Sequence, residues 1–358
     1  MNLQTDINTF IESLPEISMK KHFYIWGTGH TASLYQEGFS REEKLNIFGY
    51  VDNDKEKWNS NFFGYKVFSP YEISMDKEAT VLICSPQPKV VAAISKQVKE
   101  MGIPYYHIDE IIWGLHKKEI KTFFEWLEDD KSRITLLEVM RSRTLGLYPN
   151  PDIVSENPYA PSSEFTELNP NEIFVDCGSF VGDTMERFIW QRSGVFKKII
   201  MFEPDDNNIK AMKYRIERLK REWALEDSSL QIFPYAVSDR QTIAIIENNP
   251  HKNNLGTCII LNREISKEDE IIKTVSIDEI IEEPITYLKA DIESFEYRML
   301  LGAEKTIKKY KPKLGICIYH NAVDLYSIPH LIKKYNYDYK FMIRHYSFQS
   351  SETVLYAW

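Results

Sequence analysis

Two glycine turns, one in each half of the chain, limit the folds that this sequence can adopt. Gly27-Thr-Gly29 and Gly178-Ser-Phe-Val-Gly182 each follow a short apolar segment. A carboxylate ends the next apolar segment in each half, Asp52 in the first and Glu203 in the second. A strand, a glycine turn, a helix and a second strand that ends in an acid are typical of a doubly wound parallel sheet. The pattern therefore predicts an α/β protein with two Rossmann-like domains.

The length of 358 residues also suits two domains, each with its own core. We expect the first domain at 1–115, a helical segment and proline-rich linker at 116–171, and the second domain at 172–358. Alternating apolar segments predict the helices and strands of the first part. The expected strands are 22–26, 47–51, 65–68, 80–84 and 104–108, and the expected helices include 6–17, 89–101 and 116–140.

The second domain is expected to begin with a strand and to end with an antiparallel hairpin at the edge of its sheet. A helix is expected at 184–191, and apolar residues spaced by three and four from Ile209 to Trp223 predict another. We expect a turn at 236–239. The expected strands are 172–176, 198–203, 230–235, 242–247, 271–277, 285–291, 313–320, and the pair 339–345 and 353–358 of the hairpin.

Composition excludes several classes of protein. A formal net charge of −9 argues against a nucleic-acid backbone as the main partner. No run of about 18 apolar residues predicts a membrane span, and the N-terminus lacks a signal-peptide pattern. Cysteines at close spacing would suggest a zinc site, but the four cysteines are far apart. We therefore expect a cytoplasmic protein, and we expect Cys84 and Cys317, which lie in strand-like apolar segments, to be buried thiols.

The turn of the second half is the stronger candidate for a ligand site. Asp176 and Gly178 stand where a strand gives way to a helix, which lets backbone approach a ligand closely. Glu203 ends the next strand, where a carboxylate receives the hydroxyls of a nucleoside ribose, and Pro204 suits the first turn of the following helix. A structural turn beside a solvated glutamate is the alternative interpretation.

A second group of ionisable residues lies at the ends of the later predicted strands. Asp291 and Glu293 stand at the carboxyl end of the strand Ile285–Ala290, His320 ends the next one, and His345 ends a later one. Ligands bind along the carboxyl edge of open α/β sheets, so these four residues predict a polar cleft. Each histidine taken singly also fits an ordinary core or surface position.

The second half resembles FkbM-type S-adenosylmethionine-dependent methyltransferases, over about 185 residues from Glu172 to Trp358. The order and spacing of several short motifs carry this resemblance. They are Phe174-Val-Asp-Cys-Gly-Ser-Phe-Val-Gly-Asp-Thr184, Phe202-Glu-Pro204, Ala236-Val-Ser-Asp239, Leu288-Lys-Ala-Asp-Ile-Glu293, Leu301-Gly-Ala303, Lys311-Pro-Lys313, Ile318-Tyr-His320, Arg344-His-Tyr-Ser347 and Glu352-Thr-Val-Leu-Tyr-Ala357.

The resemblance implies a seven-stranded class I methyltransferase sheet and O-methylation, often of sugars or natural products. It places S-adenosyl-L-methionine against three groups of residues, with Asp291 near the transferred methyl. Its implied cofactor residues are Asp176, Gly178, Ser179, Gly182, Asp183 and Thr184 at the first turn, Glu203 and Pro204 at the ribose, and Val237, Ser238 and Asp239 near the adenine. The family commonly has glycine where this chain has Ser294, so a turn with positive φ would need a shifted loop here.

A hydroxyl acceptor is a poor nucleophile and gains from a base within hydrogen-bond reach. Asp291 and His320 are the candidate bases, with Glu293 and His345 in support. A divalent metal held by Asp291, Glu293 and His320 is an alternative, because oxygen ligands suit magnesium or manganese. Three aromatic residues of the linker are candidates for a lid over the acceptor: Tyr148, Tyr159 and Phe165.

The first half leaves more alternatives open. Gly49-Tyr-Val-Asp-Asn-Asp54 and Phe63-Gly-Tyr-Lys-Val-Phe-Ser-Pro70 resemble small Rossmann-like domains attached to sugar-modifying enzymes. The domain then recognises a nucleotide or nucleotide sugar, serves as a scaffold or dimer contact, or holds NAD at Gly27 and Asp52. The expected function is O-methylation of a sugar or glycan, as in surface polysaccharide synthesis. The rivals are an NAD(P)- or nucleotide-sugar-binding oxidoreductase and a non-catalytic glycan-binding module; a homo-oligomer is also open.

Overall fold

A computed structural model describes residues 3–16, 21–39, 41–42, 45–246, 259–260 and 270–358. The chain forms two compact units. The first contains Met1–Val154, Tyr319–Ser327 and Ser347–Thr353, and the second contains Ser155–Ile318, Ile328–Tyr346 and Val354–Trp358. The helical segment after residue 115 thus belongs to the first unit, and two short segments from late in the sequence join it.

The first unit is built on a six-stranded sheet with the order β3-β4-β2-β1-β5-β6. All its neighbours are parallel except the hairpin of β3 and β4. Numbered along the chain without β3, this is the 3-2-1-4-5 order of a doubly wound sheet. The strands are β1 (His22–Trp26), β2 (Ile47–Val51), β3 (Asn61–Phe62), β4 (Tyr65–Phe68), β5 (Ala79–Ile83) and β6 (Tyr105–His107).

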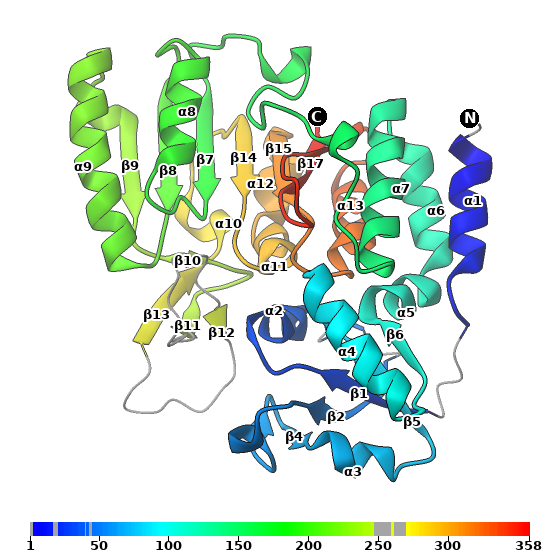
Figure 1. Ribbon diagram of the computed structural model, residues 1–358. Helices are drawn as coiled ribbons and strands as arrows, with labels where there is room; N and C mark the ends of the chain where they lie inside the picture. Colours follow the sequence, from blue (N-terminus) through cyan, green and yellow to red (C-terminus); the bar gives the residue numbers. More distant parts are fainter. Residues whose placement is uncertain (1–2, 17–20, 40, 43–44, 247–258, 261–269) are drawn as a thin grey trace. The chain divides into compact units, whose positions relative to one another are not determined.

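Seven helices belong to the described part of this unit: α1 (Leu3–Ser13), α2 (His30–Phe39), α3 (Pro70–Ser74), α4 (Pro88–Glu100), α5 (Ile108–Leu115), α6 (Lys117–Trp126) and α7 (Asp130–Thr144). Helix α1 packs against α6 and α7 (Figure 1). The single helix expected at 116–140 is wrong, because two helices fill this range. The Asp129 side chain accepts a hydrogen bond from the Ser132 amide at 2.7 Å and so begins α7 as a new helix.

The second unit contains a seven-stranded sheet with the order β16-β17-β15-β14-β7-β8-β9. Strands β9, β8, β7, β14 and β15 are parallel, and β17 runs antiparallel to β15. The expected parallel sheet with a terminal antiparallel edge is therefore confirmed. Its strands are β7 (Ile173–Cys177), β8 (Lys198–Phe202), β9 (Leu230–Phe233), β14 (Tyr287–Ala290), β15 (Lys313–Cys317), β16 (Phe341–His345) and β17 (Thr353–Ala357).

A smaller four-stranded sheet of the order β10-β13-β11-β12 accompanies the large one. Its strands are β10 (Ala236–Val237), β11 (Thr242–Ile246), β12 (Ile259–Ile260) and β13 (Glu270–Val275). The turn expected at 236–239 is wrong at its start, because β10 pairs with β13 in parallel. The helices that follow β7 are α8 (Asp183–Gln191), α9 (Asp206–Trp223), α10 (Ile277–Ile280), α11 (Glu296–Leu301), α12 (Glu304–Tyr310) and α13 (Asp324–Tyr335).

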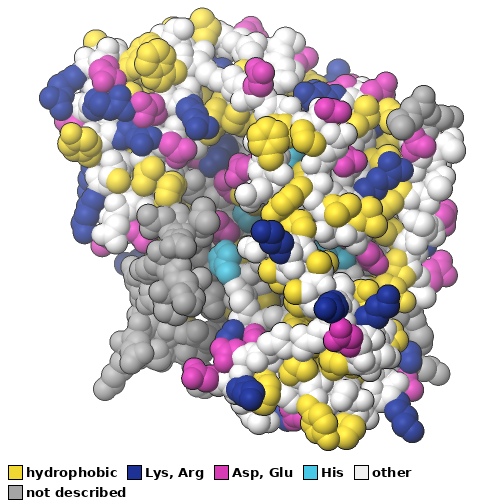
Figure 2. All heavy atoms as spheres, in the orientation of Figure 1, with side chains coloured by type: hydrophobic (Ala, Val, Ile, Leu, Met, Phe, Trp, Pro, Cys, Tyr) yellow, Lys and Arg dark blue, Asp and Glu magenta, His cyan; other side chains and the backbone are white. Residues whose placement is uncertain are grey.

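Basic and acidic side chains are intermixed on the surface formed by α8 and α9 (Figure 2, upper left). Arg218 contacts both Glu186 and Glu222, and Lys220 contacts Asp227. A face with paired charges of both signs is a solvated helix surface.

The proline-rich linker is irregular but partly buried. Phe165 is fully buried and contacts the rings of Tyr287 and Tyr356, so it packs in the core of the second unit. This burial favours a structural role for Phe165 over a role in a lid. Tyr148 is exposed, and it belongs to the first unit.

Two expectations from the sequence concern the cysteines and membrane-spanning helices. The expected burial of Cys84 and Cys317 is confirmed. None of the helices in the described ranges has the length and apolar character that crossing a membrane requires.

Candidate functional site

The glycine turn of the second unit is held between two strands. Gly178 and Gly182 both have a φ of 79°, a region that few other residues adopt. The amides of Gly178 and Ser179 donate to the Phe202 carbonyl at 3.1 and 3.0 Å. A Cβ on Gly178 would lie 2.0 Å from the Asp291 carbonyl oxygen. Glycine is therefore required at 178 both by conformation and by the approach of the chain after β14.

Glu203 directly follows β8 and faces this turn. Its Oε2 accepts a hydrogen bond from the Phe180 amide at 2.9 Å, and its Oε1 accepts from the Asp205 amide and the Asn208 side chain. Burial raises the pKa of Glu203, and these three donors oppose that shift. Oε2 thus retains a lone pair for a hydroxyl donor. Pro204 comes next and is half-buried.

Asp176, in β7, is fully buried beneath the turn. Its Oδ1 lies 3.0 Å from Nζ of Lys289, whereas its Oδ2 has no hydrogen-bond partner. Burial raises the pKa of Asp176, and the Lys289 ammonium opposes this effect. Lys289 also donates to the Gly178 carbonyl at 3.2 Å, so one cation ties the carboxylate to the turn. A buried carboxylate oxygen without a donor is costly unless a ligand completes it.

Helix α8 begins at the end of the turn. Asp183 and Thr184 are its first two residues, and Gly182 is its N-cap. The hydroxyls of Tyr159 and Thr184 lie 3.2 Å apart, and Ser179 donates its hydroxyl to the Asp176 carbonyl. The first amides of a helix favour an anionic group, so this end of the site suits a carboxylate.

The candidate adenine residues lie at the end of β10. The Ser238 amide donates to the Val275 carbonyl at 2.8 Å, and the Ser238 hydroxyl donates to Asp239 at 3.0 Å. Val237 and Ser238 are buried, and Asp239 is half-buried. A Cβ on Gly302 would lie 2.2 Å from the Ser238 carbonyl oxygen, so the chain is tightly packed here.

The loop after β14 carries Asp291 and Glu293. The Asp291 amide donates to the Cys177 carbonyl at 3.1 Å, and the Ile292 amide donates to Glu296 at 2.8 Å. Glu293 has a φ of 53° and Ser294 a φ of 77°. The position where the family commonly has glycine thus does adopt positive φ, and serine occupies it without a change of region. The loop brings Asp291 to the same edge as Asp176.

The two histidines fall in different units. His345 is the last residue of β16, is buried, and accepts a hydrogen bond from the Ser155 amide at its carbonyl. His320 comes three residues after β15 and belongs to the first unit. Asp291, Glu293 and His345 belong to the second unit. The roles of all four as acid–base or metal-binding residues stay predictions.

The carboxylate at the glycine turn of the first unit, Asp52, has different contacts from Glu203. Oδ2 of Asp52 accepts from the amide and the hydroxyl of Thr28 and lies 3.2 Å from Nζ of Lys57. Its Oδ1 accepts from the Asp54 amide at 2.9 Å. Asp52 thus already has four donors, one of them an ammonium, whereas Glu203 has three donors and no cation among the described residues. This disfavours the interpretation of Asp52 as the ribose acceptor of an NAD site.

Two residues near the second turn were not among the sequence candidates for catalysis or binding. They are Lys289 and Glu296. Lys289 carries a detectable signal, because a lysine inside the short apolar segment Tyr287–Ala290 is unusual in a buried strand. Glu296 carries no such signal, because its burial depends on how the loop after β14 packs.

Two family models match parts of the chain. The family model described as the methyltransferase FkbM domain matches residues 176–339, and the model described as C2185-like, N-terminal, matches residues 19–109. No curated protein matches the chain.

Two solved structures are among those similar to this chain. The methyltransferase FkbM from Methylobacillus flagellatus KT is 20% identical, with a TM-score of 0.58, and the match covers 100% of this chain and 99% of that chain. SMU.1697c, a putative methyltransferase from Streptococcus mutans solved with SAH, is 13% identical, with a TM-score of 0.36, over 57% of this chain and 98% of that chain.

The family match spans the glycine turn, Glu203 and the Asp291 loop, which are the features built above from single residues. The C-terminal half of the chain therefore carries a methyltransferase FkbM domain, and the protein is a methyltransferase.

Proposed function

We propose that the protein is an S-adenosyl-L-methionine-dependent O-methyltransferase that acts on a hydroxyl of a sugar or glycan. Surface polysaccharide synthesis in the cytoplasm is the setting that we propose for it. The observation that carries the proposal is the pairing of Asp176 and Glu203 around one glycine turn, within the range matched by the FkbM domain model. Both carboxylates are buried, and each keeps an oxygen that is able to accept a hydrogen bond.

The residues of this turn fit the cofactor. Oδ2 of Asp176 is buried without a partner and suits an ammonium donor. Glu203 suits ribose hydroxyls, and the first amides of α8 suit a carboxylate. When bound, S-adenosyl-L-methionine supplies an already activated methyl group. The chain's own task is then to align the acceptor and exclude water.

We assign the acceptor side to the loop after β14 and to the chain after β15. Asp291 follows β14 and His320 follows β15, and these two strands are parallel neighbours. The acceptor hydroxyl loses its proton as its oxygen forms the new bond, and a carboxylate oxygen of Asp291 or a ring nitrogen of His320 takes that proton. Glu293 and His345 support these groups.

Calorimetric titration with S-adenosylhomocysteine tests the cofactor site. We expect the wild-type chain to bind, and Glu203→Ala to weaken binding by about 10- to 150-fold, the range for a hydrogen bond to a charged group. Asp206→Ala is the matched control, because Asp206 is an exposed acid three residues further on. A wild-type chain that does not bind S-adenosylhomocysteine would contradict the proposal.

Methyl transfer from radiolabelled S-adenosyl-L-methionine to nucleotide sugars and oligosaccharides tests the acceptor class. Asp291→Asn is expected to lower turnover while S-adenosylhomocysteine affinity stays within about twofold, because this change keeps the shape of the side chain. If cofactor binds but the methyl group reaches only an amine or a small non-sugar hydroxyl, the sugar assignment is wrong and the cofactor site stands.

A further inference from the structure

The segment 319–327 lies late in the sequence. It continues the chain directly from β15, yet it forms part of the compact first unit. It contains His320, one of the two candidate bases. We propose that Arg143 is a positioning residue that fixes the peptide between Tyr319 and His320 for methyl transfer. This inference rests on the proposed function, because it gives that reaction a further residue.

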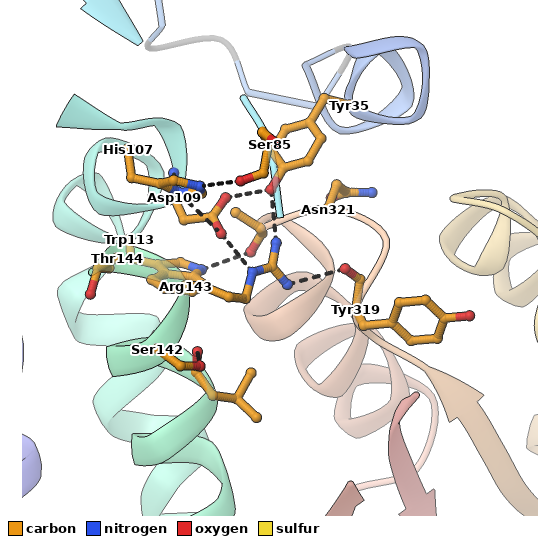
Figure 3. A network of polar contacts seen from close by, with 12 residues as sticks. Tyr35, Ser85, His107, Asp109, Trp113, Ser142, Arg143, Thr144, Tyr319 and Asn321 are labelled. Carbon is orange, nitrogen blue, oxygen red and sulfur yellow. Dashed lines mark hydrogen bonds and ion pairs between the residues drawn. The ribbon is translucent and has the colours of Figure 1, made fainter. Parts of the chain in front are cut away.

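Arg143 lies in α7, and its guanidinium contacts three separate parts of the first unit (Figure 3). Its Nε donates to Oδ2 of Asp109 at 2.6 Å, and one terminal nitrogen donates to the Tyr35 hydroxyl at 2.8 Å. The other terminal nitrogen donates to the Tyr319 carbonyl at 3.1 Å. Tyr35 in turn donates its hydroxyl to Asp109, which closes the network.

Burial makes this network rigid. The side chains of Arg143 and Asp109 are almost entirely shielded from solvent. Burial lowers the pKa of Arg143, but Asp109 and Tyr35 outweigh it and raise that pKa above its ordinary value. Burial likewise raises the pKa of Asp109, and Arg143, His107 and Tyr35 together bring it below its ordinary value. Both groups therefore stay charged, and the fork of the guanidinium has one fixed orientation.

The contact at Tyr319 acts on the neighbouring residue through the peptide plane. The carbonyl of Tyr319 and the amide nitrogen of His320 share one planar unit, so holding the oxygen restricts the main chain on which His320 begins. A proton acceptor loses much of its effect when it is displaced by about 1 Å. Lysine at position 143 could not keep all three contacts, because it has no planar fork of donors.

Other contacts hold the same segment further along the chain. Trp113 donates its indole N–H to the Ala322 carbonyl at 3.0 Å, and Arg41 contacts Asp324 at 2.7 Å and Ser327 at 2.8 Å. The segment is therefore expected to stay attached when Arg143 is changed. Trp113 and Arg41 thus hold the segment in the first unit independently of Arg143, whose proposed role concerns the Tyr319 carbonyl alone. Arg41 therefore supplies a matched control.

The test compares Arg143→Lys and Tyr35→Phe with Arg41→Lys. Hydrogen exchange of the peptide that contains 319–322 is measured by mass spectrometry, together with S-adenosylhomocysteine affinity and the kinetics of methyl transfer to the acceptor found above. We expect Arg143→Lys to speed exchange at 319–322 and to lower kcat by about 10- to 100-fold. KM for S-adenosyl-L-methionine and the affinity for S-adenosylhomocysteine should change by less than about twofold, as for a group that acts on the catalytic step alone.

The controls decide between positioning and mere attachment. Arg41→Lys should speed exchange near 324–327 and leave kcat within about twofold. Tyr35→Phe keeps the Arg143–Asp109 pair and should give a smaller loss of kcat than Arg143→Lys; it also replaces Arg143→Lys if that variant does not fold. Equal losses of kcat in the Arg143 and Arg41 variants would overturn the proposal. So would an Arg143 or Tyr35 variant with unchanged kcat.

Failure of the proposed function gives a different result. If the wild-type chain binds no S-adenosylhomocysteine, the methyl-transfer role of the site is wrong whatever Arg143 does. If it binds and transfers methyl groups but kcat is insensitive to Arg143 and Tyr35, the methyltransferase assignment stands and only the positioning role is lost.

Discussion

The two glycine turns share a sequence pattern, but the carboxylate that faces each turn has different surroundings. In the first unit, Asp52 accepts hydrogen bonds from Thr28 and Asp54 and pairs with Lys57. Burial raises the pKa of Asp52, but these contacts outweigh burial and bring the pKa below its ordinary value. In the second unit, burial raises the pKa of Glu203, which pairs with no cation among the described residues.

This difference shows how the same fingerprint serves two purposes. A carboxylate that already has four donors, a cation among them, stabilises its own turn and gains less from a ligand. A buried carboxylate with spare capacity costs stability in the free protein and gains partners when a ligand binds. The surroundings of Asp52 thus favour a structural role for the first turn, whereas those of Glu203 leave the second turn better able to accept a ligand. Each prediction below compares the two.

The largest difference is expected for the cation beside each turn. Lys289→Met should destabilise the second unit by about 3–5 kcal/mol, because it leaves the buried charge of Asp176 without a partner. Lys57→Met should cost less than about 1 kcal/mol, because Lys57 is 42% exposed. Thermal melting measures both. Similar shifts for the two variants would mean that the turns do not differ in burial as described.

The glycines themselves give the next test. Gly178→Ala places a Cβ 2.0 Å from the Asp291 carbonyl oxygen and forces alanine to a φ of 79°. We expect a cost of about 2–5 kcal/mol from strain and overpacking, with loss of S-adenosylhomocysteine binding. Gly29→Ala is the control, because its Cβ would meet nothing within 4 Å. Melting and calorimetry on both variants check this, and a Gly178→Ala protein that binds normally would disprove the close approach.

The opposite pKa shifts predict opposite behaviour with pH. Glu203 has a raised pKa, so it takes up a proton as the pH falls from neutral towards 4.5, and S-adenosylhomocysteine affinity should weaken already in that range. Asp52 has a lowered pKa, so the stability that it contributes is present above 3.8 and is lost only below that value. Calorimetry between pH 7 and 5 measures the affinity. Glu203→Gln should bind weakly with a shallower pH dependence; an unchanged slope would assign the titration to another group.

Much of this comparison could be predicted from the sequence, and the reason is local. Strand, turn and terminal acid are close in the chain, so apolar spacing and two glycines place Asp176, Gly178 and Glu203 on one edge of a parallel sheet. The break at Asp129 was missed because a helix cap competes with an apolar period that continues through it.

The contacts made by residues distant in sequence could not be predicted. The donors to Asp52 include Thr28, 24 residues earlier in the chain. The membership of 319–327 in the first unit depends on contacts with Arg143, Trp113 and Arg41. No periodicity records such pairings, because they are set by how helices and strands pack. Lys289 is an intermediate case. The sequence shows a lysine inside an apolar strand, but it does not show that Asp176 is its partner.

The smallest expected effect concerns the loop that approaches the second turn. Ser294 has a φ of 77°, and its buried hydroxyl has no hydrogen-bond partner. Both features cost free energy, so Ser294→Gly should stabilise the protein by about 1 kcal/mol, less the entropy that glycine gains in the unfolded chain. Thermal melting checks the sign, and Ser193→Gly, also at positive φ but exposed, is the matched control for strain alone. If Ser294→Gly stabilises no more than Ser193→Gly, the buried hydroxyl costs nothing. If it destabilises, Ser294 makes a contact in the protein that offsets its strain, and the serine then stabilises the loop after β14.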